Sequence, residues 1–143
     1  HHKWKGDIQK VSGYAVNYPL IGDNDLAVAK LYDMLPASAG NTSEGRTPAD
    51  NQTVRSVFVI GPDKKVKLIL TYPMSTGRNF QEILRAIDSI QLTAKYPVST
   101  PADWQPGEDV VIAGSVSDED AIKRFGPFET ILPYIRKAKQ PSS

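Results

Sequence analysis

The sequence predicts an α/β fold for this chain of 143 residues. Two patterns favour it: a strand–turn–strand pattern over residues 54–72, and a long amphipathic helix pattern that begins directly after Asn79. Shorter helix and strand patterns lie on either side. The length is that of about one domain, so the chain is long enough to bury a core.

The first element is a helix. Trp4, Ile8 and Val11 lie at i, i+4 and i+7 and so share one helix face, and Gly13 can end the helix. No N-cap residue precedes Trp4. We therefore expect a helix already under way at the start, as in a truncated chain, a proteolytic remainder or the ordered part of a longer chain.

A short strand and a second helix follow. Tyr18–Ile21 is apolar enough for one buried strand, and Asp23 or Asn24 can cap a helix that Pro36 ends. The apolar positions of that helix are Leu26, Ala29, Leu31 and Leu35. The polar composition of residues 37–53 predicts a long loop.

The hairpin is the clearest local pattern. Val54 to Ile60 is almost continuously apolar, which is typical of a strand buried on both faces. Residues 61–64, with sequence Gly-Pro-Asp-Lys, form the turn, and Val66 to Tyr72 is the return strand. Lys64, Lys65 and Lys67 indicate a solvated hairpin tip.

The long helix begins at Asn79, with Glu82 three residues later in an approximate capping box. Its apolar face is formed by Phe80, Ile83, Leu84, Ile87 and Ile90. After Lys95, three prolines within residues 97–106 indicate a linker or a wrapped arm.

The last part contains smaller elements. Glu108 to Ala113 is predicted as a strand, Ser117 as the cap of a helix that ends at Gly126, and Ile131 to Ile135 as a short apolar piece before a basic tail. The change in composition places a boundary between residues 96 and 97.

Composition excludes several classes of site. There is no cysteine, so a disulfide, a thiolate zinc site and a cysteine nucleophile are absent from the chain. The two histidines are His1 and His2, which makes a multi-histidine metal site unexpected. A net charge of +1 gives no reason to expect nucleic acid or an anionic membrane as partner. Two matches to the glycosylation pattern, at Asn41 and Asn51, are of a kind common by chance.

Two arginines are candidate site residues. Arg55 lies in the predicted buried strand, where a guanidinium needs a carboxylate partner or an anionic ligand. Arg78 lies just before a helix N-terminus, whose amides favour an anion. The alternatives are a strand-end arginine that reaches solvent and a solvated loop arginine, and the pattern alone leaves them open.

Several longer motifs resemble the 1-Cys peroxiredoxins. They comprise Val54–Lys65, Leu68–Pro73, Thr76–Asn79, Glu82–Arg85, Ser89–Ala94, Thr100–Trp104 and Gly107–Ile112, with His2–Ile8 and Tyr18–Ile21 also fitting. The resemblance covers essentially the whole chain and is strongest to fungal, often mitochondrial, members. It implies part of a thioredoxin-like fold over residues 1–96 and a small α+β C-terminal extension, the dimerisation arm, over residues 97–143.

The resemblance also implies a function. Family members reduce hydrogen peroxide and organic hydroperoxides with a peroxidatic cysteine thiolate and an external thiol reductant, without metal or organic cofactor. That cysteine lies upstream of every motif present here, so we expect this chain to be inactive alone. Arg55 would lower the pKa of the thiol and bind the peroxide oxygens, and Arg78 would be the second arginine of the site.

Three further expectations follow from the resemblance. The chain would form a homodimer through the strand Val66 to Tyr72, with the C-terminal arm reaching the partner. It would be mitochondrial or cytoplasmic rather than secreted. Without the central strands of the family's sheet it would also leave unpaired edges. The alternative is a non-catalytic dimerisation or interaction module that uses the hairpin edge and the arm.

Overall fold

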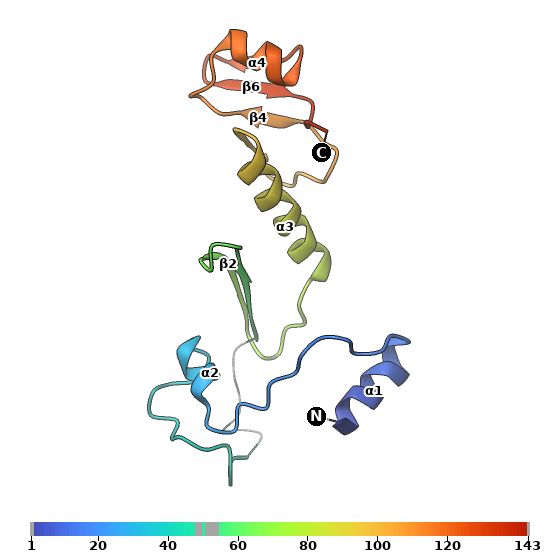
Figure 1. The fold of residues 1–143 in the computed structure, drawn as a ribbon, viewed down its shortest axis with the longest axis vertical. Coiled ribbons are helices and arrows are strands. Elements are labelled where there is room, and N and C mark those ends of the chain that lie inside the picture. Colours follow the sequence, from blue (N-terminus) through green and yellow to red (C-terminus); the bar gives the residue numbers. More distant parts are fainter. Residues whose placement is uncertain (1, 48–49, 51–54, 143) are drawn as a thin grey trace. The chain divides into compact units, whose positions relative to one another are not determined.

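A computed structural model describes residues 2–47, 50 and 55–142, and its ribbon is drawn in Figure 1. Contacts divide the chain into two compact units. The first comprises His1–Ser56 and Leu70–Thr76, and the second comprises Val57–Ile69 and Gly77–Ser143.

Helix α1 spans His2–Ser12, as the spacing of Trp4, Ile8 and Val11 predicts. Gly13 ends it with a positive φ of 79°, and its amide donates to the Gln9 carbonyl at 2.9 Å. Glycine adopts this left-handed conformation without the penalty that a Cβ atom brings. The predicted helix and its stop are therefore confirmed.

The strand predicted at Tyr18–Ile21 is wrong. These residues have no regular secondary structure, and Tyr18 and Ile21 are 56% and 68% exposed. A strand needs a hydrogen-bonded neighbour, and the described residues provide none at this position, while Pro19 has no N–H to donate.

Helix α2, Ala27–Leu31, is shorter than predicted. The Asp23 carboxylate accepts hydrogen bonds from the amides of Val28 and Ala29, both at 2.8 Å, so Asp23 does satisfy the helix start. The helix ends well before Pro36, because Asp33 adopts a φ of 54° and the Met34 amide donates to the Ala29 carbonyl at 2.8 Å. This bond pattern is that of a Schellman motif.

Three of the four apolar positions predicted for that helix are nevertheless buried together. Leu26, Ala29 and Leu35 form a small core, against which Met34 and Ala39 pack. Leu31, by contrast, is 79% exposed. The described parts of the loop 37–53 contain only turns and irregular backbone, and Asn51 lies outside the described residues.

The hairpin consists of β1, Arg55–Ile60, and β2, Val66–Tyr72, which form a two-stranded sheet. Val54, the predicted first strand residue, lies outside the described residues. The expectation that the first strand is buried on both faces is wrong: β1 is half-buried, and Ile60 is 48% exposed. A two-stranded sheet has too few neighbours to cover both faces of an apolar strand.

Helix α3 spans Phe80–Lys95 and is capped as predicted. The Asn79 side chain accepts from the Glu82 amide at 3.1 Å. The reciprocal half of the capping box is replaced by an ion pair, because the Glu82 carboxylate binds the Arg85 guanidinium instead.

The C-terminal part forms an antiparallel four-stranded sheet in the order β3–β4–β6–β5. Its strands are β3, Val98–Ser99; β4, Val110–Ile112; β5, Glu129–Leu132; and β6, Ile135–Ala138. Strand β3 lies in the segment predicted as a linker or arm. The apolar piece 131–135 is part of a hairpin rather than a single element.

Helix α4, Asp118–Phe125, lies over this sheet (Figure 1). It has the predicted cap: the Ser117 hydroxyl accepts from the Asp120 amide at 3.2 Å, and Gly126 ends the helix with a φ of 76°. Ala121 on α4 packs with Ile112 and Ala138. This burial attaches the helix to the sheet.

A second cluster joins α3 to the sheet. Val98, Trp104 and Val110 are buried together, and Leu92, Tyr96 and Phe125 pack against them. Trp104 is 1% exposed, and its indole N–H donates to the Glu108 carbonyl at 3.1 Å. None of the described helices is long and apolar enough to cross a membrane.

Candidate functional site

Arg55, the first predicted site residue, is the first residue of β1 and is half-buried. Its guanidinium Nη1 donates a long hydrogen bond of 3.5 Å to the carbonyl oxygen of Thr76. No carboxylate of the described residues pairs with it. Its positive charge therefore has only a carbonyl dipole as counterpart within this part of the chain.

Arg78, the second predicted site residue, is exposed in the loop before α3. Among the residues that the structure describes, it has no hydrogen-bond or ion-pair partner. Asn79, the next residue, is fixed as the cap of α3 by its bond to the Glu82 amide. The residue that follows Arg78 is thus fixed in place as the cap of α3.

The chain itself links the two arginines. Arg55 contacts the carbonyl of Thr76, which lies two residues before Arg78 in the sequence. Arg55 belongs to the first compact unit and Arg78 to the second. Their role as one site is therefore a proposal.

The hairpin turn contains a local ion pair rather than a site. Lys67 Nζ donates to the Asp63 carboxylate at 2.8 Å, and the Lys65 amide donates to the same side chain at 3.2 Å. The Lys67 ammonium holds the pKa of the Asp63 carboxyl below its ordinary value. Asp63 is therefore a turn residue with a charged partner, as its position predicts.

Nothing in the described part of the chain can serve as a metal site of three or more His, Cys, Asp or Glu side chains. With no cysteine in the sequence, the chain also has no thiol. What the arginines can do chemically is to stabilise negative charge: a cation lowers the pKa of a nearby thiol, and guanidinium N–H groups donate to a developing oxyanion.

Arg85 and Arg136 are two further arginines with defined partners, and neither is predicted as a site residue from the sequence. Arg85 binds Glu82 on its own helix and also donates to the Trp104 carbonyl at 3.2 Å. Arg136 is 8% exposed and binds Asp118 at 2.7 Å. The spacing of Arg85 and Glu82, three residues apart on a helix, is a signal that identifies their pairing in advance.

Comparisons with known proteins identify the family. Residues 89–126 match the family described as the C-terminal domain of 1-Cys peroxiredoxin. The chain is 48% identical over 143 residues to a 1-Cys peroxiredoxin of Dictyostelium discoideum, and 48% identical over 141 residues to the mitochondrial peroxiredoxin PRX1 of Saccharomyces cerevisiae. These alignments cover 99% and 97% of this chain.

Solved structures agree. A yeast mitochondrial 1-Cys peroxiredoxin is 48% identical with a TM-score of 0.86 over 97% of this chain, and a cysteine-to-serine mutant of peroxiredoxin 6 of Arenicola marina is 42% identical with a TM-score of 0.85 over 100%. This chain covers 64% and 66% of those two chains. It spans about half the length of the first two relatives, 56% and 52%.

The fold that the sequence predicts is thereby confirmed: the mixed helix and strand structure corresponds to the C-terminal part of peroxiredoxin structures. The sequence has no cysteine that could act as the family's peroxidatic residue. The chain belongs to the 1-Cys peroxiredoxin family and corresponds to the C-terminal part of its members.

Proposed function

We propose that this chain supplies the arginine-bearing part of a thiol-dependent peroxidase that reduces hydrogen peroxide and organic hydroperoxides. The observation that carries the proposal is the hydrogen bond from the Arg55 guanidinium to the carbonyl of Thr76, two residues before Arg78. The Thr76 carbonyl, which belongs to the same compact unit as Arg55, accepts this bond at 3.5 Å. Neither arginine is neutralised by a carboxylate among the described residues.

The chemistry needs a cysteine thiolate that this chain does not contain. The thiolate sulfur attacks one peroxide oxygen, the O–O bond breaks, and a sulfenic acid and a hydroxide or alkoxide are formed. Arg55 lowers the pKa of the thiol, and both arginines stabilise the leaving oxygen. An external thiol then reduces the sulfenic acid. The chain alone is therefore expected to have no peroxidase activity.

The remaining parts of the proposal concern organisation. Residues 1–96 would form half of a thioredoxin-like domain, and residues 97–143 the C-terminal extension. Strand β2 and the extension would form a homodimer interface. The exposure of Val66 and Ile69, 49% and 53%, supports an interface at β2. The mitochondrial designation of the yeast relative supports a mitochondrial location, with the cytoplasm as the other choice.

The second candidate is a non-catalytic dimerisation or interaction module. The exposed apolar residues of β2 support this module as much as they support a dimeric peroxidase, because an edge strand can pair with another chain regardless of redox chemistry. A peroxidatic cysteine segment in the upstream coding sequence supports the peroxidase, and its absence supports the module.

A chimera tests the peroxidase directly. The N-terminal part of the Dictyostelium relative is joined to this chain in place of that relative's own C-terminal part, and kcat/KM for hydrogen peroxide is measured with excess dithiothreitol. We expect activity that Arg55→Gln lowers about 100-fold, the loss typical of removing one oxyanion donor. Lys65→Gln, at the hairpin turn, is the matched control.

The thiol pKa of the same chimera gives a second readout. Loss of Arg55 is expected to raise this pKa toward the ordinary cysteine value, about 8.5, measured from the pH dependence of thiolate absorbance. A folded chimera in which Arg55→Gln changes neither rate nor thiol pKa would rule out the proposed role. An inactive but folded chimera would favour the interaction module.

A further inference from the structure

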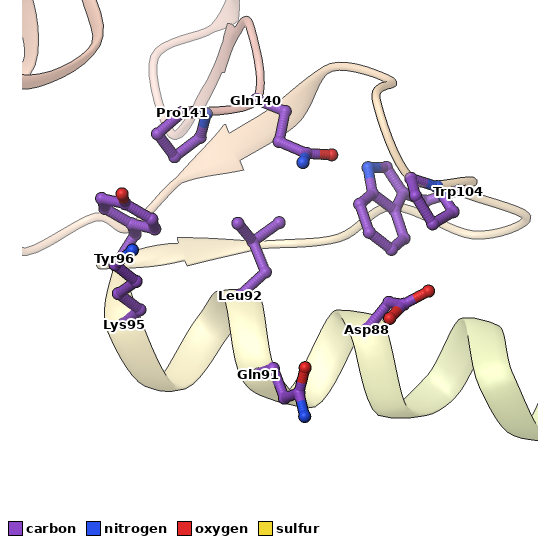
Figure 2. A pocket seen from close by; sticks show the side chains of 9 residues that line it. Asp88, Gln91, Leu92, Lys95, Tyr96, Trp104, Gln140 and Pro141 are labelled. Atoms are coloured by element: carbon purple, nitrogen blue, oxygen red, sulfur yellow. The ribbon is translucent and has the colours of Figure 1, made fainter. Parts of the chain in front are cut away.

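The second unit contains a hollow of about 390 Å³ between helix α3 and the C-terminal tail (Figure 2). Its lining residues are Asp88, Gln91, Leu92, Lys95, Tyr96, Trp104, Pro106, Gln140 and Pro141. The volume lies within the range of sites that hold small ligands or peptide side chains. None of these residues has a part in the proposed peroxide chemistry.

The tail above the hollow is held at two points. The Gly107 amide donates to the Gln140 side-chain oxygen at 2.6 Å, and the Tyr96 hydroxyl donates to the Ser142 carbonyl at 2.8 Å. Figure 2 shows Leu92 pointing into the hollow from the helix, with Tyr96 at one end and Trp104 at the other. The hollow is thus a slot with Leu92 at its centre, and two hydrogen bonds hold the tail that bounds it.

Two opposite charges lie at the ends of this slot. Asp88 and Lys95 are exposed, and neither forms an ion pair with another residue in the described ranges. Lys95 Nζ lies 5.3 Å from the centre of the Tyr96 ring. The backbone positions of Asp88 and Lys95 are seven residues apart on α3, which corresponds to about 10.5 Å along the helix axis. A ligand that satisfies both must carry both signs.

We propose that this hollow docks an extended peptide segment of a partner protein, with basic, apolar and acidic side chains at alternate positions. Side chains at i, i+2 and i+4 of an extended peptide share one face and span about 13 Å. The basic side chain pairs with Asp88, the apolar one packs on Leu92, and the acidic one pairs with Lys95. The flexible side chains take up the small difference in length.

Charge complementarity selects this occupant. A purely anionic ligand is repelled by Asp88, and a purely cationic ligand is repelled by Lys95. A small apolar ligand forms an ion pair with neither charge. The proposal is independent of the peroxidase chemistry, since it involves neither Arg55 nor Arg78.

The experiment uses a fluorescein-labelled Gly-Arg-Ala-Leu-Ala-Glu-Gly peptide, titrated with the 143-residue chain at low salt and followed by fluorescence anisotropy. We expect weak, saturable binding. Asp88→Asn and Lys95→Gln each weaken it about two- to fivefold, the contribution of one exposed ion pair. Asp7→Asn and Lys123→Gln remove the same charges elsewhere and leave binding unchanged.

A change of preference provides the stricter test. Asp88→Lys leaves two positive charges at the slot, so this variant is expected to bind a Gly-Glu-Ala-Leu-Ala-Glu-Gly peptide more tightly than the Arg-containing one. Far-UV circular dichroism checks that each variant is folded. The absence of saturable binding, equal binding of a scrambled peptide, or an equal effect of the two control variants would overturn the proposal.

Discussion

The guanidinium of Arg85 joins helix α3 to the segment that carries Trp104. Its Nε and Nη2 atoms donate to the Glu82 carboxylate at 2.6 and 2.8 Å, while Nη1 donates to the Trp104 carbonyl at 3.2 Å. The Arg85 guanidinium holds the pKa of the Glu82 carboxyl below its ordinary value, and the carboxylate raises the pKa of Arg85. Three nitrogen atoms of the planar guanidinium thus donate to two segments, α3 and the segment of Trp104. The ammonium group of a lysine cannot make these three bonds in this geometry.

Arg85→Lys tests this connection. One ammonium cannot bind both Glu82 oxygens and reach the Trp104 carbonyl, so we expect a lower melting temperature for the second unit, measured by circular dichroism. Arg124→Lys, on the last turn of α4, is the matched control and should change the melting temperature little. Equal melting temperatures of wild type and Arg85→Lys would contradict the assigned role.

The indole of Trp104 makes the larger contribution to that unit. It is fully buried against Val98 and Val110, so Trp104→Ala is expected to lower the free energy of unfolding by about 3–5 kcal/mol. Urea denaturation followed by far-UV circular dichroism measures the change. Tyr134→Ala removes an aromatic side chain that is 73% exposed, and its effect should stay within about 0.5 kcal/mol.

Elements whose determinants are local were predictable from the sequence. The cap residues Asn79 and Ser117 and the stop residues Gly13 and Gly126 act within one turn of the helix they bound, and each was placed correctly. The predicted strand Tyr18–Ile21 is absent because an apolar run forms a strand only when it can pair with a neighbouring strand. Its sequence contains no information on whether that partner is present.

Contacts between distant segments were not predictable in the same way. Strand β3 has two residues and pairs with β4 across an intervening loop, so no periodicity signals it. Likewise, Arg136 is buried and donates to three acceptors between Ala113 and Asp118, which its neighbours along the sequence do not indicate. The roles of Arg55 and Arg78 came from resemblance to a family and stay predictions.

Arg136 is predicted to stabilise the loop between β4 and α4, residues 113–117. It donates to the carbonyls of Ala113 at 3.0 Å and Val116 at 2.7 Å, besides its ion pair with Asp118. Arg136→Met leaves both carbonyls without this donor, at an expected cost of about 2–4 kcal/mol in unfolding free energy by urea denaturation. Asp118→Asn should cost much less, since that side chain is 74% exposed.

The proposed dimer gives a further prediction. Leu70→Pro removes a backbone donor from β2 and should abolish the dimer, as measured by sedimentation equilibrium. Ile69→Lys places a charge on an exposed position of the same strand while keeping its backbone donor, and it should weaken the dimer as well. Leu70→Val is the control. A dimer of unchanged strength in both disruptive variants would exclude β2 as the interface.

Acidification tests the ion pairs of the C-terminal sheet. The Asp109 carboxylate lies 3.0 Å from Lys139 Nζ and 3.7 Å from Lys137 Nζ, and the hydrogen bond from Lys139 is the main reason why the pKa of Asp109 is lowered. A carboxyl whose pKa is lower in the folded than in the unfolded state stabilises the fold above the unfolded pKa, about 3.9. This stabilisation is lost as the pH falls through the lower, folded value.

The melting temperature of Asp109→Asn should therefore lie below that of wild type at pH 7, and the difference should shrink as the pH falls from about 5 to below 3. High salt should shrink it at pH 7 too, because these charges are accessible to solvent ions. Asp7→Asn, which removes a carboxylate on α1 that has no ion pair with a described residue, is the matched control. A difference that grows on acidification would mean that Asp109 is destabilising when charged, the opposite of what its two lysine neighbours require.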